Sequence, residues 1–157
     1  MKNWTLVFLV LITACKCNNG KDKQTAEDTL LVIPDTLLVY DVNSEAKTMK
    51  KYTEVPDSAF TAIRVVNGLN EKYPSVQLQF VKQSNDTVYV SVPNNQHLAE
   101  QMGSAGSAAW YADAVINLTS IPGVNYVNID MQRGSHAAPG TFGENSYKEY
   151  KVDSVGR

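Results

Sequence analysis

Residues 103–131 read GSAGSAAWYADAVINLTSIPGVNYVNIDM, and this stretch holds the clearest structural pattern in the chain. Its first part carries small and apolar side chains at helical spacing, which predicts a helix. Pro122 cannot continue that helix, and Gly123 supplies the turn that follows. Residues 126–131 then alternate between polar and apolar side chains, which predicts a strand with one buried face.

The predicted helix has two different faces. Ser104 or Ser107 is expected to cap its start, because a serine hydroxyl can accept a hydrogen bond from the first turn. The side chains expected on the buried face share apolar or small character and are Ala108, Tyr111, Ala112, Val115, Leu118 and Thr119. Trp110, Asp113 and Asn117 fall on the opposite face, which we expect to be exposed.

The N-terminus has the pattern of a targeting segment. Lys2 gives a positive start, and residues 5–12 form an apolar run that is too short to span a bilayer. The run ends in Ile12-Thr13-Ala14-Cys15, which resembles a bacterial lipobox. This resemblance implies cleavage before Cys15 and lipidation of its thiol, whereas the alternative is an ordinary secretory signal with a chance cysteine.

Four regions are expected along the chain of 157 residues. Residues 1–14 form the lipoprotein signal peptide, and residues 15–35 hold the lipidated cysteine and a polar tether. Residues 36–132 form one small domain. Residues 133–157 are rich in Gly, Ser and Ala and predict an irregular arm, or alternatively an arm with a short edge strand that pairs with another subunit.

The middle of the chain predicts further elements in a simple order. Residues 37–42 form a strand, and a helix with Asp57 or Ser58 as its cap extends to Pro74. Residues 76–80 and 88–92 alternate between apolar and polar side chains and predict a hairpin that is covered on one side only. The expected fold is therefore α+β, with two helices on one face of a mostly antiparallel sheet.

The second half of this pattern resembles the GerMN domain, a sporulation and spore-germination module. The stretches that match are Val88 to Val92, Gly103-Ser104, Leu118-Thr119, Pro122-Gly123-Val124 and Val127 to Ile129. Asp113 and Asn117 depart from the family pattern, which has a glutamine and a threonine there. The resemblance implies a small α+β domain similar to ring-building envelope modules, and contacts with envelope proteins or peptidoglycan instead of catalysis.

Reactive side chains are sparse in this sequence. His97 and His136 are the two histidines, and no spacing of ligands predicts a metal site or a cofactor. A triad of Ser, His and Asp scattered along the chain stays open, because its members need not be close in sequence. The net charge of −2 gives no basic surface for nucleic acid.

The candidate binding surface combines Trp110, Asp113, Asn117 and Tyr89, since exposed aromatic side chains with polar neighbours are common at interfaces. The alternative is that Trp110 packs under the tail or under the loop around His97. A carbohydrate-binding module would instead present a shallow groove lined by Tyr89, Trp110 or Tyr111.

These observations predict a non-enzymatic lipoprotein of the bacterial cell envelope. It is anchored to a membrane by its N-terminal lipid and contacts an envelope protein or peptidoglycan, and a homo-oligomer is one form that such contacts could take. The second hypothesis is a peptidoglycan- or carbohydrate-binding module, and the third is a hydrolase with a scattered triad.

Overall fold

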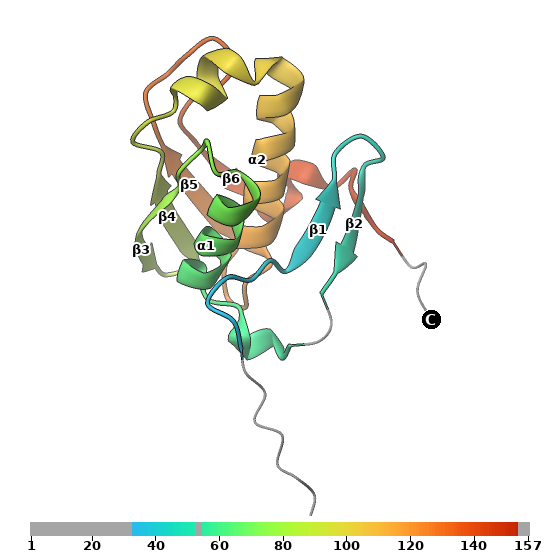
Figure 1. The fold of residues 1–157 in the computed structure, drawn as a ribbon. Coiled ribbons are helices and arrows are strands. Elements are labelled where there is room, and N and C mark those ends of the chain that lie inside the picture. Colours follow the sequence, from blue (N-terminus) through green and yellow to red (C-terminus); the bar gives the residue numbers. More distant parts are fainter. Residues whose placement is uncertain (1–32, 53–54, 154–157) are drawn as a thin grey trace, which may run out of the picture. The chain divides into compact units, whose positions relative to one another are not determined.

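The computed structural model describes residues 33–52 and 55–153. The predicted signal peptide, Cys15 and nearly all of the predicted tether lie outside these described residues. Within them the chain forms two β-sheets and two α-helices, so the prediction of an α+β domain is confirmed (Figure 1). The prediction of one sheet is wrong, because the early strands form a sheet of their own.

The larger sheet has four strands in the order β3-β4-β5-β6. Its outer pairs, β3 with β4 and β5 with β6, are antiparallel, whereas β4 and β5 run parallel. The bounds of the four strands are β3 Gln79–Ser84, β4 Thr87–Ser91, β5 Tyr126–Asp130 and β6 Gly140–Gly143. The predicted hairpin and the predicted strand over 126–131 are therefore confirmed. The first strand of the hairpin begins at Gln79, however, so the prediction of strand for residues 76–78 is wrong.

Alternation of side chains gives the large sheet one buried face. Val88 and Val90 on β4 are buried, as are Val127 and Ile129 on β5. The hairpin turns at Asn85, whose φ of 54° is a left-handed conformation that asparagine tolerates well. Since only one face is apolar, helices are expected on that face alone.

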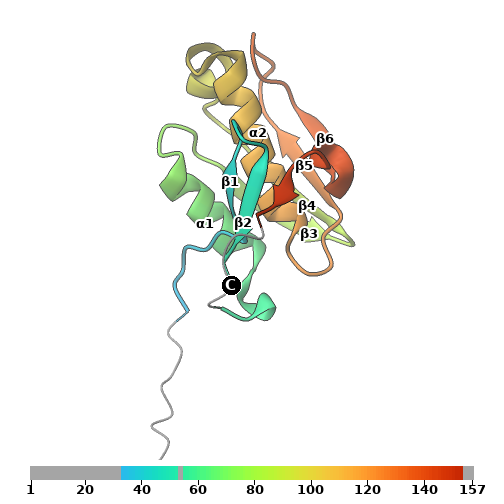
Figure 2. The ribbon, with the colours of Figure 1, turned by 90° about the vertical axis from the view of Figure 1, so that its right-hand side faces the viewer.

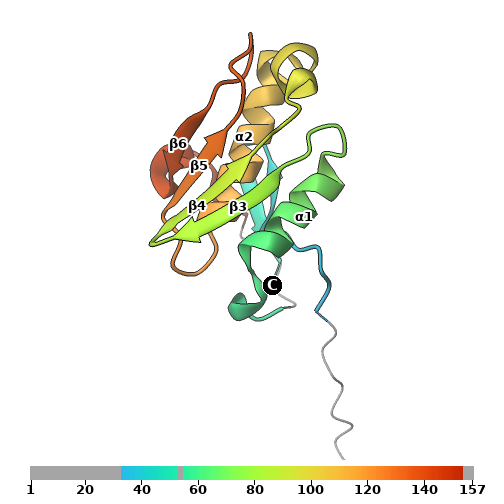
Figure 3. The ribbon, with the colours of Figure 1, turned by 90° about the vertical axis from the view of Figure 1, so that its left-hand side faces the viewer.

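Two helices cover this face, α1 (Ala62–Lys72) and α2 (Gly103–Thr119) (Figure 3). The 3₁₀ turn η1 (Asp57–Ala59) precedes α1, and the helix proper begins after Thr61, whose hydroxyl accepts from the Arg64 N–H. The helix cap is therefore Thr61, and the predicted cap at Asp57 or Ser58 is wrong. Leu69 and Val65 lie in the main core with the valines of the sheet.

A second, smaller sheet packs on the other side of α2. Its order is β1-β2-β7, with bounds β1 Tyr40–Asn43, β2 Thr48–Lys51 and β7 Lys151–Val152. Val42 and Tyr150 form a separate buried cluster with Ala112 and Ile116 of α2. The helix thus has a sheet on each side, and every residue from Trp110 to Leu118 is buried (Figure 2).

The C-terminal segment contributes to both sheets. It supplies β6 to the large sheet, continues through the 3₁₀ turn η3 (Glu144–Tyr147), and supplies β7 to the small sheet. The prediction of an irregular arm is therefore wrong for residues 140–152, and β7 matches the alternative of a short edge strand. In this structure β7 pairs with β2 of the same chain.

The start of α2 is built differently from the prediction. A π-helical turn, η2 (His97–Gln101), leads into it, and Met102 occupies the N-cap without a side-chain cap. The Ser107 hydroxyl is buried and donates to the Leu98 carbonyl oxygen at 2.5 Å, while the Ser104 hydroxyl faces His136. Neither serine caps the helix. In the described part of the chain, no helix combines the length and apolar character needed to cross a membrane.

Candidate functional site

The predicted binding surface on α2 is buried. Trp110 and Asp113 are each 1% exposed, and Asn117 is 0% exposed. The prediction that they share an exposed face is wrong. Trp110 lies in the main core, Asp113 contacts the end of α1, and Asn117 contacts the start of β1. The alternative placed Trp110 under the tail or under the loop around His97, and its burial is confirmed: Trp110 lies in the main core, which also contains Leu98 of η2 and Ala137 of the tail.

Tyr89 lies on a different surface from these three residues. It is half-buried on β4, between the inward-facing Val88 and Val90, and therefore points to the outer face of the large sheet. The Lys82 ammonium lies 4.9 Å from the centre of its ring. The four residues of the predicted surface are therefore not brought together.

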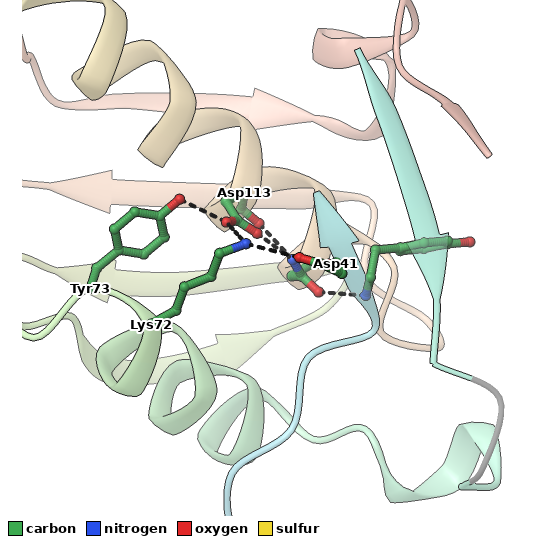
Figure 4. Close-up of polar contacts among 6 residues, drawn as sticks. Asp41, Lys72, Tyr73 and Asp113 are labelled. Atoms are coloured by element: carbon green, nitrogen blue, oxygen red, sulfur yellow. Dashed lines mark hydrogen bonds and ion pairs between the residues drawn. The ribbon is translucent and has the colours of Figure 1, made fainter. Parts of the chain in front are cut away.

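Asp113 is the centre of a polar cluster that joins three elements (Figure 4). Its carboxylate contacts the Lys72 ammonium at 2.6 Å and accepts a hydrogen bond from the Tyr73 hydroxyl at 2.8 Å. The other carboxylate oxygen accepts a hydrogen bond from the side-chain amide of Asn117 at 2.9 Å. The side-chain oxygen of Asn117 in turn accepts from the backbone N–H of Tyr40 at 2.8 Å. The cluster thus links the end of α1, the middle of α2 and the start of β1.

The pKa values within this cluster reflect burial and charge together. Burial raises the pKa of Asp113, although the hydrogen bond and the charge of Lys72 oppose that rise. For Lys72, burial acts to lower the pKa, but the hydrogen bond and charge of Asp113 outweigh it and raise the pKa. Burial, with the charge of Asp113, also raises the pKa of Tyr73. The carboxylate is therefore held by an ammonium, a phenol and an amide, all of which the fold supplies.

This cluster fastens the small sheet and the helices together. The described residues leave no buried polar side-chain atom without a hydrogen-bond partner, so Asp113 and Asn117 have their partners inside the protein. The helical spacing of four residues between Asp113 and Asn117 is visible in the sequence. Their contact with Lys72 and Tyr73 depends on how α1 and α2 pack, and the sequence pattern did not indicate it.

An open pocket of about 540 Å³ lies at the N-terminal part of α2. The segment 133–139 forms one wall, and Phe142 of β6 and Tyr147 of η3 form another. Tyr111 of α2 lines the pocket as well, and its ring lies 5.3 Å from that of Phe142. The pocket therefore combines an aromatic lining with the polar side chains of a loop.

Hydrogen bonds from several elements hold the 133–139 loop in place. The Glu100 carboxylate accepts from the Ser135 N–H at 2.9 Å and from its hydroxyl at 2.8 Å. The Tyr111 hydroxyl donates to the Ala138 carbonyl at 2.5 Å and accepts from the Ala138 N–H at 3.0 Å. Just before the loop, the Asn95 amide donates to the Gln132 carbonyl. A loop fixed in this way presents its outer side chains in a defined geometry.

Gly134 lets this loop lie directly against η2. A Cβ atom at this position would lie 2.4 Å from the Ala99 Cβ and 2.7 Å from a Glu100 carboxylate oxygen. The Gly134 N–H donates to the Ala137 carbonyl at 2.8 Å, which closes the loop as a tight turn. The sequence shows Gly134 among other glycines and gave no sign of this contact.

Three polar side chains of the pocket face solvent. The Ser104 hydroxyl and His136 Nδ1 are 3.1 Å apart, while His136 Nε2 has no hydrogen-bond partner among the described residues. Arg133 lines the pocket and forms no salt bridge with a described residue. His97, the other histidine, bonds to Gln101 and does not line this pocket. Sequence reasoning noticed His136 but did not single out Arg133.

Ser104 and His136 form two members of a possible catalytic triad. No carboxylate of the described residues lies within 4.0 Å of the His136 ring nitrogens, and Glu100 is bonded to Ser135 instead. The third member is therefore not assembled in this structure. The described residues also contain no group of three His, Cys, Asp or Glu side chains placed to hold a metal ion.

Comparisons with other proteins give no assignment. No protein-family model matches the chain, and neither the curated proteins nor the solved structures contain a match. The resemblance to the GerMN domain therefore stays a prediction from the sequence.

Proposed function

We propose that this protein is a non-enzymatic lipoprotein of the bacterial cell envelope that binds a partner in the pocket beside α2. Its N-terminal lipid holds it at a membrane, and its GerMN-like domain contacts an envelope protein or peptidoglycan. The observation that carries the proposal is the pocket itself, where side-chain hydrogen bonds from Glu100 and Tyr111 fix an irregular loop.

Two further features support a binding role. The pocket offers aromatic surface and hydrogen-bonding groups side by side, which is the usual composition of a recognition site. The run of elements α1, β3, β4, α2 and β5, a helix, a hairpin, a second helix and a strand, also supports the GerMN-like assignment made from the sequence, although the structure adds β2 before this run and β6 and β7 after it.

The proposal is tested by crosslinking in intact cells. A photoreactive amino acid at Pro139, an exposed residue of the pocket rim, is expected to capture a defined envelope component. The same group at Ile63, which is 56% exposed on α1, serves as the control. Equal capture from both positions, or capture from neither, would contradict binding at the pocket. Purified sacculi incubated with the same two variants distinguish a peptidoglycan partner from a protein partner.

A second candidate function follows from the distance of 3.1 Å between Ser104 Oγ and His136 Nδ1. A hydrolase would use Ser104 as the nucleophile and His136 as the base. A fluorophosphonate probe is expected to leave the protein unlabelled if the binding role is correct. Labelling of the natural protein that is lost in Ser104→Ala would favour the hydrolase.

A further inference from the structure

We infer that the pocket binds the carboxyl terminus of a peptide chain. The terminal carboxylate would lie at Arg133 and His136, and the last apolar side chain would lie on Phe142 and Tyr147, the half-buried aromatic side chains of the pocket. This inference rests on the proposed function and names the chemical class of ligand for the same site.

The polar side of the pocket is suited to a carboxylate. Arg133 is a permanent cation without a salt bridge to a described residue, and a guanidinium can bind a carboxylate through two parallel hydrogen bonds. His136, on the same loop, has no hydrogen-bond partner for Nε2 among the described residues, and this nitrogen donates whenever it carries the proton. Glu100, the acid bonded to the loop, lines a neighbouring pocket instead of this one.

The apolar side of the pocket is suited to one or two side chains. The rings of Tyr111 and Phe142 lie 5.3 Å apart at an angle of 46°, and Tyr147 closes the same wall. Tyr111 is 8% exposed and supports this wall from within the core, so the half-buried side chains of Phe142 and Tyr147 supply most of its accessible apolar surface. A volume of about 540 Å³ admits a group larger than a simple anion.

A cationic side next to an apolar side indicates the end of a peptide chain as the ligand, more than a simple anion or a purely apolar group. In an ordinary polypeptide a main-chain carboxylate occurs only at the last residue, and a pocket with a cation beside an apolar wall suits a last residue that is apolar. A fixed loop lowers the entropy lost on binding, because the donors are already in position. Protein C-termini and the stem peptides of peptidoglycan both carry this group, and they differ in the chirality of the last residue.

The test compares two probes that differ only in the carboxylate. Acetyl-alanyl-phenylalanine is titrated into the full chain, purified in detergent, as the free acid and as the C-terminal amide, and the heat of binding is measured. We expect the free acid to bind at least tenfold more tightly. In Arg133→Gln, the ratio between acid and amide is expected to fall towards one. Lys50→Gln, which removes an exposed positive charge on β2, is expected to leave the ratio unchanged.

Further probes ending in two L-alanines or two D-alanines identify the source of the natural ligand, and tighter binding of either free acid supports the inference. Equal binding of acid and amide, absence of binding by every free acid, or an unchanged ratio in Arg133→Gln would each overturn it. Crosslinking from Pro139 in cells would still detect a partner in that case, so failure of this inference is distinguishable from failure of the proposed function.

Discussion

Gly68 in the middle of α1 shows how one missing side chain positions the start of the domain. A Cβ atom there would lie 2.5 Å from the Leu37 carbonyl oxygen, and the Leu37 N–H donates to the Arg64 carbonyl at 3.1 Å. We expect Gly68→Ala to destabilise the protein by about 1–3 kcal/mol, although alanine favours a helix by about 1 kcal/mol. Urea denaturation measures the change, and Glu71→Ala at an exposed position of the same helix is the control. A stabilised Gly68→Ala variant would show that the contact is not close.

Asp113 carries a second prediction at the scale of a single residue. Asp113→Ala leaves the Lys72 ammonium, the Tyr73 hydroxyl and the Asn117 amide without their shared acceptor. We expect a loss of about 3–5 kcal/mol in the free energy of unfolding, as for other buried ion pairs that lose one partner. Asp41→Asn removes an acid that is 64% exposed and 3.4 Å from Lys72, and its cost should stay below about 1 kcal/mol. Equal losses in the two variants would argue against a central role for Asp113.

Tyr73 makes stability depend on pH at the alkaline end. Its pKa is raised in the folded protein, so above its usual value of 10.0 the unfolded chain loses a proton that the folded protein keeps. Stability must then fall as the pH rises above 10, by about 1.4 kcal/mol per pH unit for each such group. Tyr147, with its pKa raised to about 12, acts in the same direction between pH 10 and 12. We expect Tyr73→Phe to weaken the dependence of the free energy of unfolding on pH, by an amount that corresponds to at most one proton. Urea unfolding at several pH values measures this dependence. The same slope in Tyr73→Phe and in Tyr52→Phe, at an exposed position, would contradict this.

Among the elements, the small sheet packs on α2 through a buried cluster separate from the main core, and we expect it to open separately. Its buried cluster with α2 depends on Tyr150, which is 4% exposed and also accepts a hydrogen bond from the Lys47 ammonium at 3.0 Å. We expect Tyr150→Ala to cost about 3 kcal/mol and to act mainly on this sheet. Hydrogen exchange should speed up at least tenfold at the amides of β1 and β2, with β4 and β5 still protected. Val152→Ala, at a side chain that is 54% exposed, is the control. Equal acceleration in both sheets would show that they unfold together.

Elements with a long local pattern could be predicted from the sequence. The strands β4 and β5 were found because their side chains alternate over five residues, and α2 was found because its stop at Pro122 is clear. The strand β3 does not alternate in this way, and the predicted strand 76–80 overlaps it only at Gln79 and Phe80. The strand β7 has only two residues, and its partner β2 lies about a hundred residues earlier. No local pattern carries such a pairing, so a second sheet could not be foreseen.

The prediction of an exposed face on α2 was wrong because the burial of this helix depends on the arrangement of the whole molecule. Polar Asp113 and Asn117 among small residues are typical of an exposed helix face when one covering layer is assumed. Two covering layers bury both faces, and the ammonium of Lys72 then makes a buried carboxylate tolerable. The pocket could not be foreseen either, since its lining comes from α2, the 133–139 loop, β6 and η3.

At the same scale, the proposed membrane anchor has a direct test. Cells fed an alkyne fatty acid are expected to label the natural protein, and Cys15→Ser should abolish the label because the lipid needs that thiol. Cys17→Ser, two residues further on, should leave the label intact and is the matched control. A mature protein without an acyl group would exclude this mode of attachment.

The shared origin of β6 and β7 has a consequence for biosynthesis. A ribosome makes residues 140–152 after every other strand of the two sheets, and these residues complete both sheets. A nascent chain that stops before Gly140 lacks one edge strand of each sheet, and Ala112 and Ile116 of α2 lack the Tyr150 ring that covers them. Both sheets and the cover of α2 are therefore complete only once residues 140–152 have been synthesised, and we expect a chain cut short before Gly140 to fold less stably than one that contains them.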